Sequence, residues 1–261
     1  MLVPNPKRFN FYDRIYLGDA TNMKDIPSSS VHLIFTSPPY FEAKKEYQKE
    51  QTLDQYLVMI HCMMRESMRV LINGGRLVVN IANVGRNPYT SINMHINLMA
   101  DGLKFIKRGE IIWDKGASTG GSTAWGSWRS ASNPTLRDVH EYLLVFSKCS
   151  AKREKPHGIN SVSAADFAVS TQSVWHISSV SAKKRKHPAP FPIELARRII
   201  DLYSFVGDIV LDPFMGSGTT LETAVLMKRH YVGIDIMPEY IKLAEQYINT
   251  AKKERNKNGP T

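Results

Sequence analysis

The sequence predicts an α/β protein built on a doubly wound, largely parallel sheet. Short apolar runs rich in β-branched residues recur along the chain, and amphipathic helical stretches separate several of them. Two of these runs end in sharp turns, one rich in proline and the other rich in glycine. This alternation is typical of a doubly wound sheet, because each crossover helix returns the chain to a parallel strand.

The individual elements follow from these patterns in chain order. Strands are predicted at residues 14–17, 31–35, 76–81, 110–113, 142–146, 208–211 and 231–234. A helix is predicted over residues 53–71, where apolar residues recur at helical spacing before Asn73-Gly74-Gly75 stops it. Further helices are predicted at residues 193–203, 219–228 and 238–252. Two stretches, residues 116–137 and 149–173, break the pattern and are expected to be excursions from the sheet.

The amino-acid composition limits the classes of protein to which this chain can belong. The chain has 261 residues, 43% hydrophobic and 22% charged, which favours one globular domain over residues 1–261. Its two cysteines, Cys62 and Cys149, form no C-x-x-C pair, so neither a disulfide framework nor a zinc site is expected. No apolar run approaches the roughly 18 residues of a membrane span. We therefore expect a soluble, cytoplasmic protein.

The formal net charge of +10 favours a polyanionic partner such as DNA or RNA. Basic surfaces also serve solubility alone, so the charge leaves both interpretations open. The motifs have to decide between them.

The first motif is Asp212-Pro213-Phe214-Met215-Gly216-Ser217-Gly218-Thr219-Thr220, a strand end running into a glycine turn and a helix. Glycines allow the backbone to turn sharply and to approach a ligand closely. Asp235 ends the next predicted strand, where a carboxylate can accept both hydroxyls of a ribose. Asp212 is placed to accept the amino group of a methionine moiety, whereas it would repel a diphosphate.

Two nucleotide-binding alternatives lack their signatures. No Gly-Lys-Ser/Thr sequence is present, which disfavours a P-loop, and Leu221 stands where a dinucleotide site has its third glycine. By itself the turn also remains compatible with an ordinary strand-to-helix connection.

The second motif is Thr36-Ser37-Pro38-Pro39-Tyr40, which ends the second predicted strand. Two prolines make the loop rigid and remove N–H groups, so that carbonyl groups are free to face a ligand. The Ser37 side chain and the Pro38 carbonyl can then accept the two hydrogens of a base amino group. Tyr40 offers an aromatic face on which an extruded base can stack. Taken alone, Pro-Pro-Tyr is also compatible with a surface turn.

The two motifs together resemble the amino-methyltransferases of restriction–modification systems, in the permuted β class, where the Pro-Pro-aromatic motif comes first. The resemblance implies S-adenosylmethionine as cofactor, S-adenosylhomocysteine as product and no metal. The expected catalytic residues are Ser37, Pro38, Pro39 and Tyr40. The expected cofactor-binding residues are Asp19, Thr36, Phe191, Asp212, Pro213, Phe214, Gly216, Ser217, Gly218, Thr219, Thr220 and Asp235.

The resemblance also implies a seven-stranded methyltransferase sheet whose last strand, at residues 141–146, is antiparallel. It makes residues 116–137 and 149–173 the target-recognition excursions. Double-stranded DNA with a flipped base is the expected substrate, and the expected DNA contacts are Trp125, Trp128, Arg129, Lys183, Lys184, Arg185 and Lys186. Packing of the tryptophans against the core, and a solvated loop at the lysines, are the alternatives. A restriction endonuclease acting on the same site is an expected partner, and the enzyme is expected to be a monomer or a homodimer.

The choice of base rests on Ser37. Family members with Ser before Pro-Pro usually methylate N4 of cytosine, and those with Asp or Asn usually methylate N6 of adenine, which is the alternative. A C5-cytosine enzyme needs a Pro-Cys nucleophile that this chain lacks. RNA or protein-glutamine methyltransferases usually carry Asn-Pro-Pro-Tyr, which Ser37 disfavours. A silent nucleic-acid-binding module is disfavoured because both motifs are intact.

Overall fold

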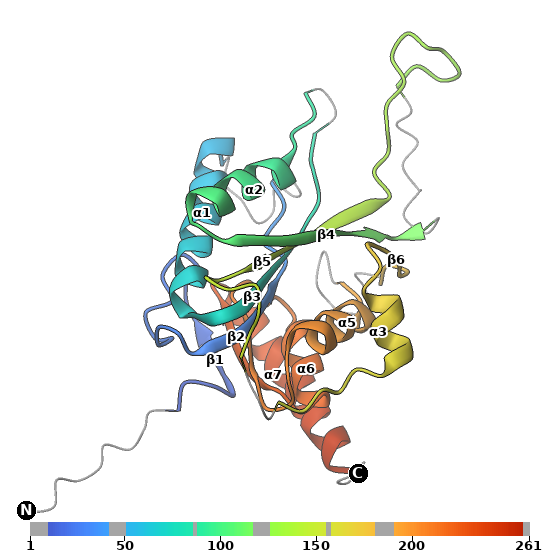
Figure 1. The fold of residues 1–261 in the computed structure, drawn as a ribbon. Coiled ribbons are helices and arrows are strands. Elements are labelled where there is room, and N and C mark those ends of the chain that lie inside the picture. The colour runs from blue at the N-terminus through green and yellow to red at the C-terminus, as the bar shows by residue number, and fades with distance from the viewer. Residues whose placement is uncertain are drawn as a thin grey trace, which may run out of the picture.

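A mixed β-sheet forms the centre of the molecule in the computed structural model, which describes residues 10–41, 51–85, 88–116, 126–154, 158–180 and 191–257 (Figure 1). Within these residues the strands are β1 (Arg14–Leu17), β2 (Val31–Thr36), β3 (Leu71–Ile81), β4 (Ile106–Asp114), β5 (His140–Ser147), β6 (Val174–His176), β7 (Ile209–Asp212) and β8 (His230–Asp235). Their order across the sheet is β1-β8-β7-β2-β3-β5-β4-β6. Only the pairings of β5, with β3 and with β4, are antiparallel.

The helices of the described residues are α1 (Leu53–Val70), α2 (Ile92–Gly102), α3 (Ala164–Ser170), α5 (Ile193–Tyr203), α6 (Thr219–Leu226) and α7 (Pro238–Lys257). The predicted α/β class with a doubly wound, mostly parallel sheet and its reversed strand at β5 are confirmed. The strand count was wrong, because β6 adds an eighth strand within the described part of the chain. Its three residues carry no periodicity, and their pairing with β4 depends on burial of Trp175.

Two further sequence predictions need correction. Asn73-Gly74-Gly75 does not stop α1 but lies inside β3, where the β2–β3 register shifts and Gly74 has a φ of +73°. Helix α2 was not predicted, although Ile92, Ile96 and Ala100 recur at helical spacing and are fully buried. The missed helix α3 had a weaker signal, because only its terminal Ser170 is buried.

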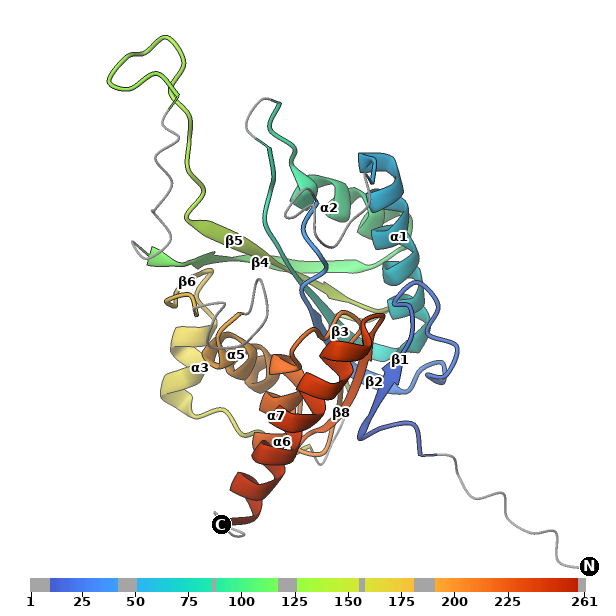
Figure 2. The same cartoon turned by 180° about the vertical axis from the view of Figure 1, so that it is seen from behind.

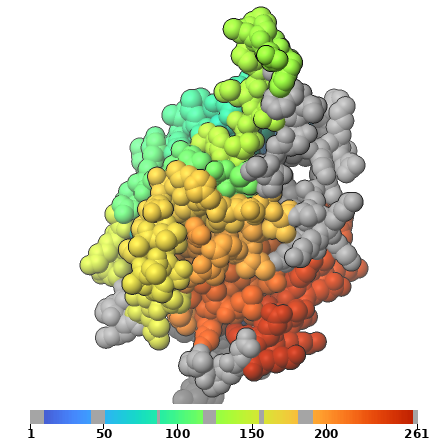
Figure 3. Space-filling model, turned by 90° about the vertical axis from the view of Figure 1, so that its right-hand side faces the viewer, coloured from blue at the N-terminus to red at the C-terminus, as the bar shows by residue number. Residues whose placement is uncertain are grey.

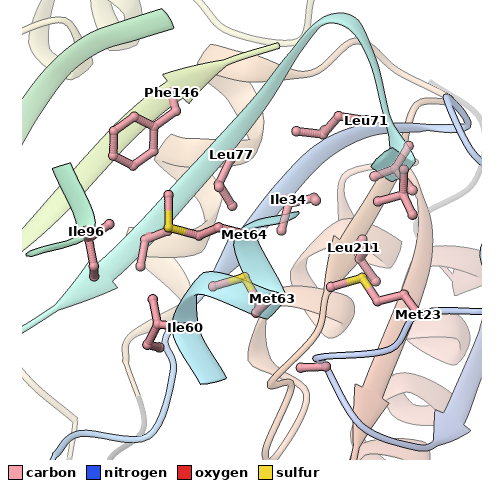
Figure 4. Close-up of a cluster of buried hydrophobic side chains, with 14 of the residues drawn as sticks. Met23, Ile34, Ile60, Met63, Met64, Leu71, Leu77, Ile96, Phe146 and Leu211 are labelled. Atoms are coloured by element: carbon pink, nitrogen blue, oxygen red, sulfur yellow. The ribbon is translucent and has the colours of Figure 1, made fainter. Parts of the chain in front are cut away.

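Helices α1 and α2 cover one face of the sheet (Figures 1 and 4). A capping box starts α1: Gln55 N–H donates to Thr52 Oγ1 at 3.2 Å, and Thr52 N–H donates to Gln55 Oε1 at 3.0 Å. One helical stripe then packs on the strands, with Ile60, Met63 and Met64 fully buried. Each such side chain contributes about 1.5–3 kcal/mol by leaving water.

Helices α5, α6 and α7 cover the opposite face (Figure 2). Leu195, Ile199 and Ile200 of α5 pack against strand residues such as Leu33 and Val210. The sheet is therefore buried on both sides, as expected where parallel strands are joined by crossover helices. Within the described residues, no helix has the length and apolar content needed to cross a membrane.

The carboxyl ends of the central strands define one edge of the molecule. Strands β2, β7 and β8 are parallel, so Thr36, Asp212 and Asp235 reach the same edge. Strand β5 runs in the opposite direction and begins there, with Tyr142 paired to Ile81 at the end of β3. Both sequence motifs and the start of β5 therefore meet at this carboxyl edge, where ligands of doubly wound sheets bind.

Candidate active site

Asp212 connects three segments at the carboxyl edge. Its Oδ1 accepts hydrogen bonds from Thr36 Oγ1 at 2.7 Å and from the Phe214 N–H at 3.1 Å, and its Oδ2 accepts from Thr220 Oγ1 at 2.7 Å. The residue is 1% exposed. Burial raises the pKa of Asp212 to about 6, and the hydrogen bonds from Thr36 and Thr220 oppose that shift. These contacts favour a role in shaping the turn and holding Thr36 of β2 beside it.

The glycine turn between β7 and α6 has the backbone geometry that the sequence implied. Gly216 and Gly218 have φ values of +50° and +81°, in the left-handed region. A Cβ on Gly218 would lie 2.8 Å from Ala244 Cβ of α7. The turn is therefore pressed against α7, and only glycine allows this approach without displacement.

Asp235, at the end of β8, faces the same turn. Its Oδ2 accepts the Gly216 N–H at 2.9 Å, and its Oδ1 accepts the Met237 N–H at 2.9 Å. Burial raises its pKa, while these backbone donors favour the charged form. Each carboxylate oxygen has a second acceptor position, so the side chain retains the capacity to bind ribose hydroxyls.

Two other predicted cofactor residues lie on either side of this turn. Asp19 is exposed just beyond β1, the neighbour of β8, and its Oδ1 accepts the Thr21 N–H at 2.8 Å. Phe191 is buried before α5, with its ring centroid 5.0 Å from that of Phe35 on β2. The structure therefore brings the predicted cofactor residues to one edge, with Phe191 packed beneath it.

The Ser37–Tyr40 loop follows β2 directly. Ser37 is partly exposed, Pro38 is buried, Pro39 is exposed and the Tyr40 ring is partly exposed. Burial of the Tyr40 hydroxyl and the nearby Glu141 carboxylate raise the pKa of Tyr40 well above its ordinary value. The hydroxyl is thus held in the protein as a neutral group while the ring remains partly accessible.

Sequence reasoning missed three residues near this loop. Asn80 Nδ2 lies 3.3 Å from Ser37 Oγ, 3.5 Å from Tyr40 Oη and 2.6 Å from Glu141 Oε2. Lys115 forms an ion pair with Glu141 Oε1. A usable signal was present, since Asn80 and Glu141 are polar residues within apolar strands. Buried polar groups of this kind need partners, and those partners come from other strands.

The predicted DNA contacts are only partly described by the structure. Trp128 is 66% exposed, and Arg129 is exposed with a φ of +54°. Both belong to residues 126–139, which project from the body of the molecule between β4 and β5 (Figures 1 and 3). Trp125, Lys183, Lys184, Arg185 and Lys186 lie outside the described residues.

Residues 149–173 lie in a different place from residues 126–139. Because β5 runs antiparallel, the chain leaves it at the amino edge, where the Arg153 guanidinium forms an ion pair with buried Asp208 immediately before β7. The Val206 N–H then donates to the Ile159 carbonyl at 3.0 Å, and Asp166 of α3 pairs with Arg197 of α5 at 3.7 Å. The Ser173 carbonyl accepts the Ile112 N–H of β4 at 2.8 Å. The described contacts of this segment thus run from the edge opposite Ser37, along α5, to the carboxyl end of β4.

No group of three or more His, Cys, Asp or Glu side chains in the described ranges has the arrangement of a metal site. Both cysteines are free; Cys62 lies on α1, and exposed Cys149 follows β5. Neither belongs to the Ser37–Tyr40 loop.

The glycine turn has no room for a Cβ at Gly218, the Asp235 carboxylate lies beside it, and the Pro-Pro loop follows the adjoining strand β2. This is the arrangement expected of an S-adenosylmethionine-dependent methyltransferase. The residues fit that cofactor, since Asp235 offers acceptors for a ribose and the turn allows close approach of the backbone. The chain belongs to the N6/N4 methyltransferase family of DNA methylases, whose model matches residues 31–246.

Individual proteins show the same likeness over most of the chain. The Type II methyltransferase M.MjaI of Methanocaldococcus jannaschii is 28% identical, with 92% of each chain covered. TTHA0409 of Thermus thermophilus, solved in complex with S-adenosyl-L-methionine, is 29% identical with a TM-score of 0.73, covering 92% of this chain and 95% of that one. The cytosine-N4-specific PvuII DNA methyltransferase is similar in fold, with 20% identity, a TM-score of 0.71 and coverage of 94% and 93%.

Proposed function

We propose that this DNA methyltransferase methylates the N4 amino group of cytosine in double-stranded DNA. The observation that supports methyl transfer to a base is the position of Ser37-Pro38-Pro39-Tyr40 at the carboxyl edge, next to the Asp212 turn. The choice of cytosine rests on Ser37, the residue before Pro-Pro. Thr36 connects the two directly, because it precedes Ser37 and its hydroxyl donates to Asp212. The loop for the base and the turn for the cofactor therefore share one support.

The chemistry requires the base nitrogen to act as the nucleophile. Ser37 Oγ and the Pro38 carbonyl accept the two amino hydrogens, which draws the nitrogen lone pair out of conjugation with the ring. Bound S-adenosylmethionine supplies an electrophilic methyl group on a sulfonium. The N–C bond would form as the bond between the sulfonium sulfur and the methyl group breaks, which leaves S-adenosylhomocysteine as a neutral thioether. The methylated nitrogen then releases one proton to solvent, and no covalent bond to the protein forms.

Access to the base requires extrusion from the duplex. An enzyme acting on a base edge inside a helix flips the nucleotide into a pocket and stacks it on an aromatic side chain. Tyr40 serves that role here: its hydroxyl is anchored near Glu141 while its ring remains partly exposed. Such stacking contributes about 1–3 kcal/mol per base.

For sequence recognition we propose residues 116–137, with Trp125, Trp128 and Arg129 as the contacts. For phosphate binding we propose the basic run Lys183, Lys184, Arg185 and Lys186. The projection of residues 126–139 beyond the sheet supports the first assignment. We propose a structural role for residues 149–161, because the Arg153–Asp208 ion pair and the Ile159–Val206 hydrogen bond lie at the amino edge. Residues 162–173 stay in the proposal for target recognition, because the Ser173 carbonyl accepts the Ile112 N–H of β4 at 2.8 Å, near the carboxyl edge.

Several features of the cellular role are part of the same proposal. Relatives such as M.MjaI are named Type II methyltransferases, which favours a restriction–modification system with an endonuclease acting on the same site. We place the enzyme in the prokaryotic cytoplasm, acting as a monomer or a homodimer. Copurification with an endonuclease encoded nearby and the mass of the purified protein in solution test these two points.

The experiment that tests the function is nucleoside analysis of DNA from a host expressing the protein. Digestion to nucleosides and mass spectrometry should reveal N4-methylcytosine, and DNA from a host without the protein provides the baseline. N6-methyladenine in its place would overturn the interpretation of Ser37 and support the alternative N6-adenine activity. Absence of both would overturn the proposed function.

A further inference from the structure

Three polar side chains from three strands meet behind the Ser37–Tyr40 loop. Asn80 lies near the end of β3 and is fully buried, and Glu141, the second residue of β5, is 3% exposed. Lys115 follows β4 directly and pairs with Glu141. The antiparallel course of β5 allows this meeting, since it places Glu141 at the same edge as the end of β3.

The hydrogen bonds fix which way the Asn80 amide faces. A carboxylate only accepts hydrogen bonds, so the Asn80 nitrogen must face Glu141 Oε2, at 2.6 Å. The same nitrogen has a second hydrogen, which is directed to Ser37 Oγ at 3.3 Å and Tyr40 Oη at 3.5 Å. Rotating the amide by half a turn would place two oxygens against each other at Glu141.

Asn80 Oδ1 is buried without a hydrogen-bond partner among the residues that the structure describes. Leaving a buried acceptor unsatisfied costs free energy, so the amide holds this orientation at an energetic disadvantage. The orientation therefore depends on the Glu141 carboxylate, whose other oxygen pairs with Lys115.

We propose that Glu141, paired with Lys115, is a positioning residue that orients Asn80 to donate to Ser37 Oγ. The proposal rests on the proposed function, in which Ser37 accepts a hydrogen of the base amino group. With the Asn80 N–H on one lone pair, Ser37 keeps its other lone pair for the base. The geometry supports this role, because Glu141 Oε2 and Ser37 Oγ both lie within hydrogen-bond distance of the same Asn80 nitrogen.

The first test is Glu141→Gln, which keeps the size and removes the charge. A glutamine has one acceptor oxygen and one amide nitrogen, so it can satisfy Asn80 or Lys115 but must present a donor to the other. We expect kcat for methyl transfer to genomic DNA to fall roughly 100-fold, the scale of a misplaced reactive group. The KM for DNA and the affinity for S-adenosylmethionine should not change.

The second test is rescue by the double variant Glu141→Gln with Lys115→Met. Removing the lysine allows the glutamine oxygen to face Asn80, so part of the lost kcat should return. A purely structural role predicts the opposite, because the double variant removes both charges and a further packing contact. If Glu141→Gln fails to fold, Asn80→Ala replaces it as the test. This variant keeps the ion pair and should lower kcat without changing KM.

Asp208→Asn provides the matched control. It disrupts another buried ion pair, with Arg153, at the opposite edge of the sheet, so it should lower stability and preserve kcat per folded molecule. Wild-type kcat in folded Glu141→Gln or in Asn80→Ala would overturn the inference, as would a double variant no faster than the single one. Inactivity of the wild type on every DNA would overturn the proposed function itself.

Discussion

At the scale of single residues, Asp235 has the contacts of a ribose acceptor. Two backbone N–H groups hold its carboxylate at the turn and leave acceptor positions free. Asp235→Ala should weaken S-adenosylmethionine binding by about 1–3 kcal/mol, the value of a hydrogen bond to a charged group. Isothermal calorimetry without DNA measures this loss.

Asp13→Ala is the matched control for Asp235→Ala. Asp13 precedes β1 and binds His230 at the amino end of β8, so its loss should leave cofactor affinity intact. If the wild type and Asp235→Ala bound S-adenosylmethionine with equal affinity, the ribose would have to bind elsewhere.

Asp212 makes a prediction about pH. Its folded-state pKa of about 6 lies above the ordinary value of 3.8, so the folded state binds more protons between these values. Stability from this group is therefore complete below about pH 4 and is lost as the pH rises through 6, by on the order of 3 kcal/mol. Asp212→Asn mimics the neutral form and lacks this titration.

The measurement is urea unfolding of the wild type and Asp212→Asn from pH 4 to pH 7. The free energy of unfolding of the wild type should decrease relative to that of the variant as the pH rises, since other titrating groups cancel in the difference. A difference that is constant over this range would show that Asp212 does not titrate there.

At the scale of elements, the turn between β7 and α6 depends on Gly218. Its φ of +81° and the 2.8 Å approach of a Cβ to Ala244 predict that Gly218→Ala destabilises the fold by about 1–3 kcal/mol. Gly102→Ala is the control, because no atom lies within 4 Å of its Cβ position and its φ is not positive. Alanine there should leave the midpoint of urea unfolding equal or higher, and a similar loss in both variants would contradict the assignment.

Residues 149–161 are predicted to have a structural role, and Arg153 tests this. Arg153→Ala leaves the carboxylate of Asp208 buried without its guanidinium partner, which should cost about 3–5 kcal/mol. Thermal unfolding measures the loss. Sequencing of methylated DNA should show an unchanged recognition sequence, and an altered one would restore this segment to target recognition.

At the scale of the whole molecule, the net charge of +10 should act through the basic run at Lys183, Lys184, Arg185 and Lys186. Each phosphate neutralised contributes about 0.9 to the slope of log affinity against log salt. Replacing the four residues by alanine should weaken binding to all DNA alike and flatten that slope. Fluorescence anisotropy at several salt concentrations measures both, and a changed methylated sequence would contradict the phosphate assignment.

The fold class, seven of the strands and the two motifs could be predicted from the sequence, because each depends on local features. Strand alternation, helical spacing and turn residues such as Gly216 and Pro38 are read within a few positions of one another. Helix α2 was not predicted, although its apolar residues have helical spacing. Strand β6 was not predicted because its three residues carry almost no local signal.

The contacts between residues far apart in the sequence could not be predicted in this way and follow from the three-dimensional packing. Thr36 reaches Asp212 across 176 residues, and the reversal of β5 brings Glu141 to Asn80 while sending residues 149–161 to the amino edge. Periodicity fixes which residues of a strand are buried, but its neighbours and direction depend on the packing of the whole sheet. For that reason the two motifs could be predicted from the sequence. The ion pair behind Ser37 and the position of residues 149–173 relative to the sheet could not.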